Sequence, residues 1–338
     1  ARALSQFRGL FAYALVPMLV FSLGERGAQR RRTLVALLCV AGALTALRGV
    51  LSWAELNDVL RLGGWLHRFA SPDEGELVGA VPSASGRFGY LRAWAGNFEG
   101  NTLGAFMVLL VPPTAYLALR SGSAVGRLAF GAGAVLVVMA LVVSYSRGAY
   151  AGAAAASLPA LYLLWRRSPW AALAVAAVGA ALLFYLVTHL AGAQDRLVTL
   201  RTLSDDPTVL HRQLVYEQIA EAVRQNPLWG VGLGTSVRAI GTGADSLYLF
   251  VLLRGGLLAT GAAAALAWFA GREVVAAFRA GRIRGLDLAI GCGLFGFAVH
   301  SLIDYTIWNP KVALAVWLLA GLLLAPALDR RKPGEAAG

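Results

Sequence analysis

Residues 142–150 carry a charge where an apolar chain can least accommodate one. Their sequence, Val-Val-Ser-Tyr-Ser-Arg-Gly-Ala-Tyr, lies between two apolar runs, each long enough to form most of a membrane helix. Placing an arginine at the centre of a bilayer costs about 2.5–3.5 kcal/mol on insertion scales, so Arg147 needs a physical reason. One reading is that Arg147 marks a helix end and extends to lipid headgroups. The other is that Arg147 faces a cavity and holds an anion, with Ser146 adding a hydroxyl donor and Gly148 allowing close approach.

A second candidate arginine, Arg212, lies in the polar stretch 191–244, on a predicted helix that would fix its orientation. Asp206 is a good N-cap residue, Pro207 fits the first helical position, and Pro227 stops a helix. These signals predict an amphipathic helix over 207–225. Arg212 and Tyr216 lie one turn apart on this helix, which either aims Arg212 at a fixed ligand or rests it on headgroups.

Three further side chains are candidates for proton transfer. Asp245 precedes an apolar run, where it is either an N-cap or a general base at the outer membrane surface. His300 and Asp304 are four residues apart, so on a helix they share one face. They form a proton relay, a structural pair or support for other site residues, and structural support is the preferred interpretation.

The segment 226–234, Asn-Pro-Leu-Trp-Gly-Val-Gly-Leu-Gly, superficially resembles a dinucleotide-binding loop. No predicted strand precedes it, and no helix with an acidic residue follows at the spacing that such a loop requires. We therefore interpret it as a flexible connector that folds back toward the membrane.

The composition is that of a polytopic membrane protein. The chain has 338 residues, of which 58% are hydrophobic and 14% are charged, against about 25% charged in soluble domains. Although the formal net charge is +12, the arginines lie in short clusters between apolar runs, which is typical of topology signals and not of nucleic-acid binding. Cys39 and Cys292 both lie inside apolar runs, so no disulfide or metal framework is expected.

The elements that must position these residues are membrane helices of about 20 residues. Basic clusters at every alternate connection give a consistent topology, which leaves two large outer loops at 54–100 and 191–244. The first apolar run then starts outside, so we expect an odd number of helices, about three, to precede this chain. The predicted membrane segments are nine runs: 7–23, 33–53, 102–119, 128–143, 149–164, 170–190, 246–270, 286–303 and 312–324.

Several short motifs, in this order and membrane placement, resemble the O-antigen ligase and polymerase superfamily of Wzy/WaaL-like membrane glycosyltransferases. Arg212 matches the arginine on the large periplasmic loop of that family. The other matching segments are Gly-Asn-Phe-Glu-Gly-Asn at 96–101, Ser-Arg-Gly-Ala at 146–149, Asn-Pro-Leu-Trp-Gly-Val-Gly at 226–232 and His-Ser-Leu-Ile-Asp at 300–304. The segment 300–304 resembles a late-helix motif of the exopolysaccharide-type members of this superfamily. Many ligases carry His-Asn-x-x-Leu where this chain has Asp-Ser-Leu-Tyr-Leu at 245–249, which favours the exopolysaccharide-polymerase type.

The resemblance implies an all-α, GT-C-like bundle forming a single transmembrane domain over 1–338, with periplasmic loops at 54–100 and 191–244. It implies transfer or polymerisation of glycan from an undecaprenyl-diphosphate carrier to a glycan or lipid acceptor, at the periplasmic face of the bacterial inner membrane.

The resemblance also implies roles for individual residues. Arg147 and Arg212 would bind the diphosphate, and Asp245 would act as the base, with His300 as the second candidate. We expect an inverting reaction without metal or cofactor, because no acidic pair with metal-binding spacing stands out in the outer loops. The supporting residues would be Ser146, Tyr216, Asn97, Asn101 and Asp304. The alternatives are a transporter or flippase of a lipid-linked glycan or another anion, and a non-catalytic scaffold, which would leave Arg147 without a purpose.

Overall fold

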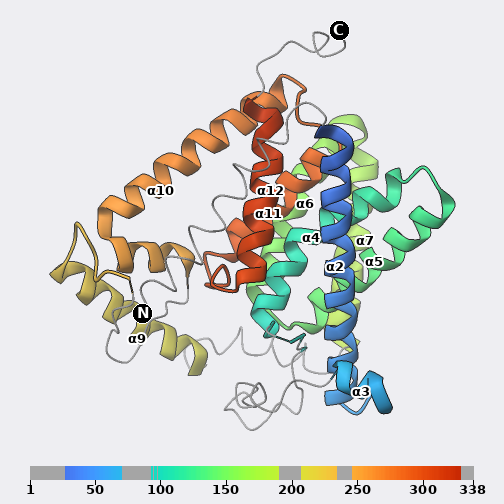
Figure 1. The fold of residues 1–338 in the computed structure, drawn as a ribbon, viewed down its shortest axis with the longest axis horizontal. Helices are drawn as coiled ribbons and strands as arrows, with labels where there is room; N and C mark the ends of the chain where they lie inside the picture. Colours follow the sequence, from blue (N-terminus) through green and yellow to red (C-terminus); the bar gives the residue numbers. More distant parts are fainter. Residues whose placement is uncertain are drawn as a thin grey trace.

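The computed structural model describes residues 27–70, 93, 95–96, 98–189, 207–233 and 246–328. These residues form helices and connections with no strand, which confirms the all-α prediction for this part of the chain (Figure 1). The helices are α2 (Gly27–Leu56), α3 (Gly64–Ala70), α4 (Gly100–Arg120), α5 (Ala124–Val143), α6 (Arg147–Arg167), α7 (Pro169–His189), α9 (Pro207–Gln225), α10 (Leu247–Arg279), α11 (Leu286–His300) and α12 (Pro310–Leu328).

Four of the described helices are long and apolar enough to cross a membrane. They are α2 from Gln29 onward, α4, α5 and α10, while α11 and α12 contain shorter apolar helices. The apolar run 7–23 lies outside the described residues. The count of nine membrane helices, the GT-C arrangement and the domain division stay predictions.

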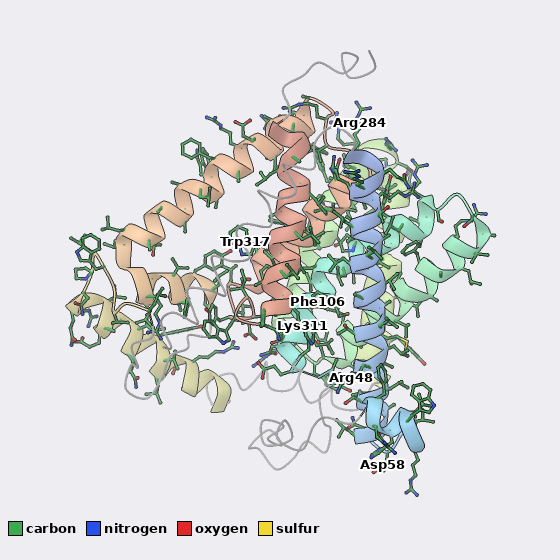
Figure 2. The ribbon with its side chains drawn as sticks, in the orientation of Figure 1. Arg48, Asp58, Phe106, Arg284, Lys311 and Trp317 are labelled. Atoms are coloured by element: carbon green, nitrogen blue, oxygen red, sulfur yellow. The ribbon has the colours of Figure 1, made fainter. Side chains whose placement is uncertain are left out.

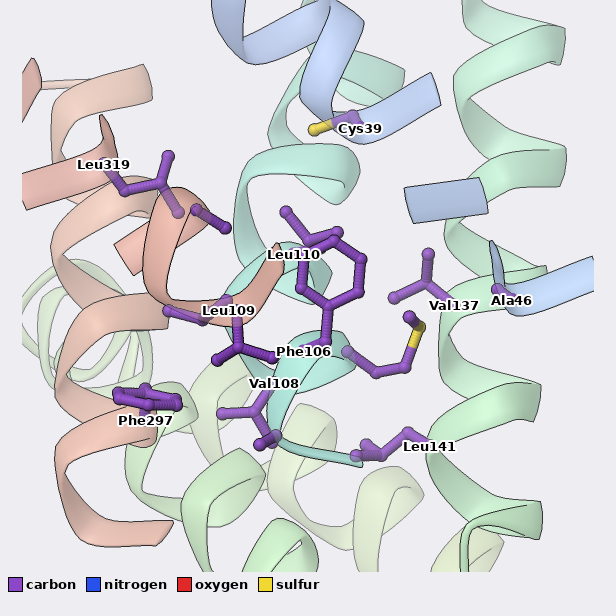
Figure 3. Close-up of a cluster of buried hydrophobic side chains, with 14 of the residues drawn as sticks. Cys39, Ala46, Phe106, Val108, Leu109, Leu110, Val137, Leu141, Phe297 and Leu319 are labelled. Carbon is purple, nitrogen blue, oxygen red and sulfur yellow. The ribbon is translucent and has the colours of Figure 1, made fainter. Parts of the chain in front are cut away.

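The centre of the bundle is α4. Its residues from Leu103 to Leu110 are all buried, as expected for a helix that is apolar on every side. It packs against α2 and α5, and also against α6 and α11. Figure 3 shows Phe106 and Leu110 of α4 among side chains from α2, α5, α11 and α12.

Small residues bring α6 and α11 into close contact. A Cβ added to Gly152 of α6 would lie 2.6 Å from the carbonyl oxygen of Gly296 on α11, so the two backbones nearly touch. Such small-residue contacts are the usual way for membrane helices to approach closely. The contact fixes the start of α6 beside the end of α11.

Basic side chains mark both ends of the bundle. At one end Arg31 pairs with Asp287, and the guanidinium of Arg32 donates to the carbonyl of Arg120 at 3.0 Å. Figure 2 shows Arg284 at this end, and Arg48 and Lys311 toward the opposite one. We call these the Arg284 end and the Lys311 end.

Helix α10 is broken, whereas the sequence predicts one continuous apolar run over 246–270. The break is at Gly256, whose φ of 62° and ψ of −159° are not helical. The segment 227–232, here called the strap, fills the break, because Val231 N donates to Leu253 O (2.8 Å) and Leu257 N donates to Pro227 O (2.9 Å). The strap thus satisfies backbone groups that the break exposes, and it is fixed by these bonds and not the flexible connector that we expected.

Candidate functional site

The turn between α5 and α6 places Arg147 at a helix start. Ser144 is fully buried, and its hydroxyl donates to the carbonyl of Leu141 at 2.7 Å. The hydroxyl of Ser146 caps α6 by accepting from the amide of Ala149 at 3.3 Å. Arg147 is therefore the first residue of α6, in a tight hairpin as the sequence predicts, and it is partly buried.

His300 lies directly against this turn. A Cβ added to Gly148 would lie 3.3 Å from Cδ2 of His300, so only glycine lets the imidazole sit at this distance without displacement. The His300 side chain is completely buried and stacks on Phe297, with ring centroids 6.4 Å apart. Within the described residues, neither ring nitrogen has a hydrogen-bond partner.

The structure only partly matches the expectation that His300 and Asp304 share one helix face, because α11 ends at His300 but the amide of Asp304 still donates to the carbonyl of His300 at 3.2 Å. Helix α11 ends at His300, and the chain turns over 301–303 before it reaches Asp304. One carboxylate oxygen of Asp304 instead accepts a hydrogen bond from the amide of Tyr305 at 2.9 Å. The spacing of four residues is that of a helical pair, but the helix does not continue far enough to form one.

The start of α10 is fastened to the end of α11. The amide of Leu247 donates to the carbonyl of Ser301 at 3.1 Å, and the hydroxyl of Ser246 donates to the same oxygen at 3.3 Å. Asp245 lies outside the described residues. Ser246, the next residue in the chain, is therefore bonded to Ser301, which directly follows His300.

Arg212 and Tyr216 lie on α9, which has the bounds expected from the sequence. Val215 and Ile219 of α9 are buried against Phe250 and other residues of α10. Arg212 is partly buried and Tyr216 is 40% exposed, so this helix buries one face and leaves another open. The described residues of α9 pack against α10 and Tyr305.

Tyr305 connects the end of α11 with the region where α9 packs on α10. It lies in the connection between α11 and α12, five residues after His300, and its ring stacks on Phe250 with centroids 4.1 Å apart. Burial raises the pKa of the Tyr305 phenol above its usual range, and the positive charge of Arg254 opposes this shift. Tyr305 is therefore neutral at physiological pH.

Arg254 is a charged residue of this region that sequence reasoning did not select. Only 4% of it is exposed, and it lies two residues before the break in α10. Its guanidinium donates to the carbonyl of Gly232 in the strap at 3.2 Å and lies 5.5 Å from the centre of the Phe250 ring. The sequence feature that could have drawn attention to Arg254 is that two glycines follow it inside an apolar run.

The remaining predicted residues are Asn101 and Asn97. Asn101 is partly buried in the first turn of α4, and Asn97 lies outside the described residues. In the described ranges, no three His, Cys, Asp or Glu side chains come together in a way that could hold a metal ion. The expectation of metal-independent chemistry stays a prediction.

Residues 132–264 match the family model described as O-antigen ligase. No curated protein matches the chain. The family match confirms the predicted relationship to the O-antigen ligase and polymerase superfamily. It includes Arg147, Arg212 and the strap, whereas His300 lies beyond it.

Proposed function

We propose that this protein transfers or polymerises a glycan from an undecaprenyl-diphosphate carrier onto an acceptor hydroxyl at the periplasmic face of the bacterial inner membrane. The family match over 132–264 supports glycan transfer of the ligase and polymerase type in general. The observation that carries the proposal is the contact of Gly148 with His300, which joins an arginine-bearing turn to a buried imidazole.

The proposed reaction is a single displacement. The acceptor oxygen bonds to the anomeric carbon, the bond from that carbon to the diphosphate oxygen breaks with its electron pair, and a base takes the acceptor proton. A diphosphate is already a good leaving group, so it needs stabilisation of its charge and not protonation. Attack from the opposite face inverts the anomeric carbon.

We assign the charge stabilisation to Arg147 and Arg212. Each guanidinium can form two parallel hydrogen bonds to phosphate oxygens, which a lysine cannot do. Asp245 is the proposed base and His300 the second candidate. Ser146, Tyr216, Asn97, Asn101 and Asp304 are proposed as supporting residues.

Replacing each arginine tests this proposal. Arg147→Ala and Arg212→Ala are expected to lower the release of undecaprenyl diphosphate by about a hundredfold or more, since one preorganised donor is typically worth this much. Arg147→Lys should retain part of the rate because it keeps the charge. The assay follows lipid-linked glycan and released lipid diphosphate in membranes, with protein levels measured alongside.

Two matched controls separate phosphate binding from general loss of positive charge. Arg224 lies on α9 like Arg212, with its side chain 77% exposed, and Arg166 lies in the last turn of α6. Arg224→Ala and Arg166→Ala should turn over glycan normally. Normal turnover by Arg147→Ala and Arg212→Ala at normal protein levels would refute the proposal, and glycan movement without release of lipid diphosphate would indicate a transporter.

A further inference from the structure

The middle residue of the turn between α5 and α6 adopts a backbone conformation that tyrosine rarely takes. Tyr145 has a φ of 49°, in the left-handed region. It directly follows Ser144, the C-cap of α5, at a position that glycine usually occupies because glycine has no Cβ to strain the backbone. Within the described residues, the other non-glycine residue with a positive φ is Asp58, a type that tolerates it better. The side chain of Tyr145 must therefore do something that offsets the strain.

The side chain of Tyr145 is held by a helix that lies far from it in the sequence. Trp53, in the last turn of α2, donates its indole N–H to the phenol oxygen of Tyr145, with 3.2 Å between the nitrogen and the oxygen. Only 5% of Tyr145 is exposed, so its side chain is packed as well as hydrogen-bonded. A glycine at this position would relieve the backbone but could not fasten the turn to α2.

Two further helices fit closely around the same turn. A Cβ added to Gly104 of α4 would lie 2.9 Å from the hydroxyl oxygen of Ser144 and 2.7 Å from Cβ of Ala149. Helix α4 therefore contacts the turn on both sides of Tyr145 in the chain. On α11, His300 lies against Gly148. The turn is thus in contact with α2, α4 and α11, and the bond from Trp53 fixes its middle residue.

We propose that Tyr145 and Trp53 are positioning residues, which hold the start of α6 so that Arg147 reaches the diphosphate of the substrate. The inference rests on the proposed function and adds two residues that act on the reaction through Arg147. Ser146, the N-cap of α6, is all that separates Tyr145 from Arg147, so a movement of Tyr145 shifts the backbone that carries the guanidinium. A displacement of about 1 Å can lower a rate about a hundredfold, so even a partial loss of this hold matters.

Removing either partner of the hydrogen bond tests the hold. Tyr145→Phe keeps the ring and removes the phenol oxygen, while Trp53→Phe removes the donor. Each should lower kcat for the release of lipid diphosphate in membranes about tenfold, the effect of losing one hydrogen bond. Tyr162→Phe is the matched control, because Tyr162 also lies on α6 but is 56% exposed and far along the helix from the turn. Its rate should equal that of the wild type.

Combining Tyr145→Phe with Arg147→Ala separates positioning from general damage. If Tyr145 acts through Arg147, the second substitution should lower the residual rate of Arg147→Ala by less than about twofold. A further tenfold loss in the double variant would overturn the inference, because Tyr145 would then affect the reaction without Arg147. Wild-type rates in both Tyr145→Phe and Trp53→Phe would overturn it as well.

Hydrogen exchange of the detergent-solubilised full chain provides a measurement that needs no turnover. The amides over 144–149 should exchange about tenfold faster in Tyr145→Phe than in the wild type, whereas those in the middle of α6 should not change. Unchanged exchange in the turn would overturn the inference. An inactive Arg147→Ala together with a wild-type rate and exchange in Tyr145→Phe would refute the inference alone. A fully active Arg147→Ala would instead refute the proposed function.

Discussion

His300 is the residue whose environment most needs an explanation. It is fully buried with both ring nitrogens unpaired in the described part of the chain. Leaving a buried polar group without a partner costs roughly 1–3 kcal/mol, which an apolar side chain of similar size would avoid. Because His300 keeps this cost beside the turn that carries Arg147, we expect its imidazole either to move a proton or to bind substrate.

We predict that His300→Leu separates stability from activity. Leucine fills a similar volume without unpaired nitrogens, so thermal stability in detergent should be unchanged or higher. Release of lipid diphosphate should fall about a hundredfold or more, which is the usual contribution of a positioned acid or base. If turnover instead remains at the wild-type level in a well-folded variant, His300 has no part in the reaction.

Single residues were predictable where the signal was local. Arg147 stands out because it interrupts apolar sequence, and its place in a turn follows from the lengths of the two flanking runs. Arg254 interrupts an apolar run as well, but its significance depends on a bond to Gly232, 22 residues earlier in the chain. The relation between His300 and Asp304 was less predictable, because their spacing cannot show that α11 ends at His300.

Among the elements, α10 shows how a break can be held within an apolar helix. Unsatisfied backbone groups at membrane depth are tolerated only where protein or water satisfies them, and here the strap does so from both sides. Two glycines allow the contact: a Cβ on Gly230 would lie 2.5 Å from Leu253 O, and one on Gly256 would lie 2.5 Å from Leu228 O. The strap therefore fixes the short first part of α10, which carries Phe250 and Arg254 and supports α9.

We predict that Gly256→Ala disrupts this joint. Alanine at a φ of 62° is strained, and its Cβ would also collide with the backbone of Leu228. The free energy of unfolding should fall by at least about 1–3 kcal/mol, and proteolysis in the strap should become faster. Gly261→Ala is the control, because open space surrounds Gly261 and alanine favours a helix interior by about 0.5–1 kcal/mol. Equal stability of Gly256→Ala and wild type would mean that the break is not a fixed feature.

The elements differ in how far sequence alone could define them. The expected helix 207–225 coincides with α9, because a proline at its start and Asn226-Pro227 after its end are adjacent signals. The break in α10 could not be predicted in this way, since glycines are common in membrane helices and only the distant strap makes one of them a break. Helix α6 is rich in alanine and glycine because it packs closely on α11, and these small residues give it a weaker membrane signal than its neighbours.

At the scale of the molecule, one arginine cluster and the turn between α5 and α6 lie at opposite ends of the bundle. The Arg284 end gathers Arg31, Arg32 and Arg120 with Asp287. The start of α6 and the end of α11 lie toward the Lys311 end. From the positive-inside bias we predict that the Lys311 end faces the periplasm, which is where the proposed function requires the reaction to occur.

Cysteine labelling from outside the membrane tests this orientation in the protein as it stands. The two native cysteines are 1% and 4% exposed, so they should give little background with an impermeant maleimide. Lys311→Cys and Arg284→Cys each replace an exposed basic residue, one at either end. We expect the reagent, applied to cells with a permeabilised outer membrane, to label Lys311→Cys at once and Arg284→Cys only after the inner membrane is opened. The reverse pattern would place the turn and His300 at the cytoplasmic side, where a periplasmic glycan transfer cannot take place.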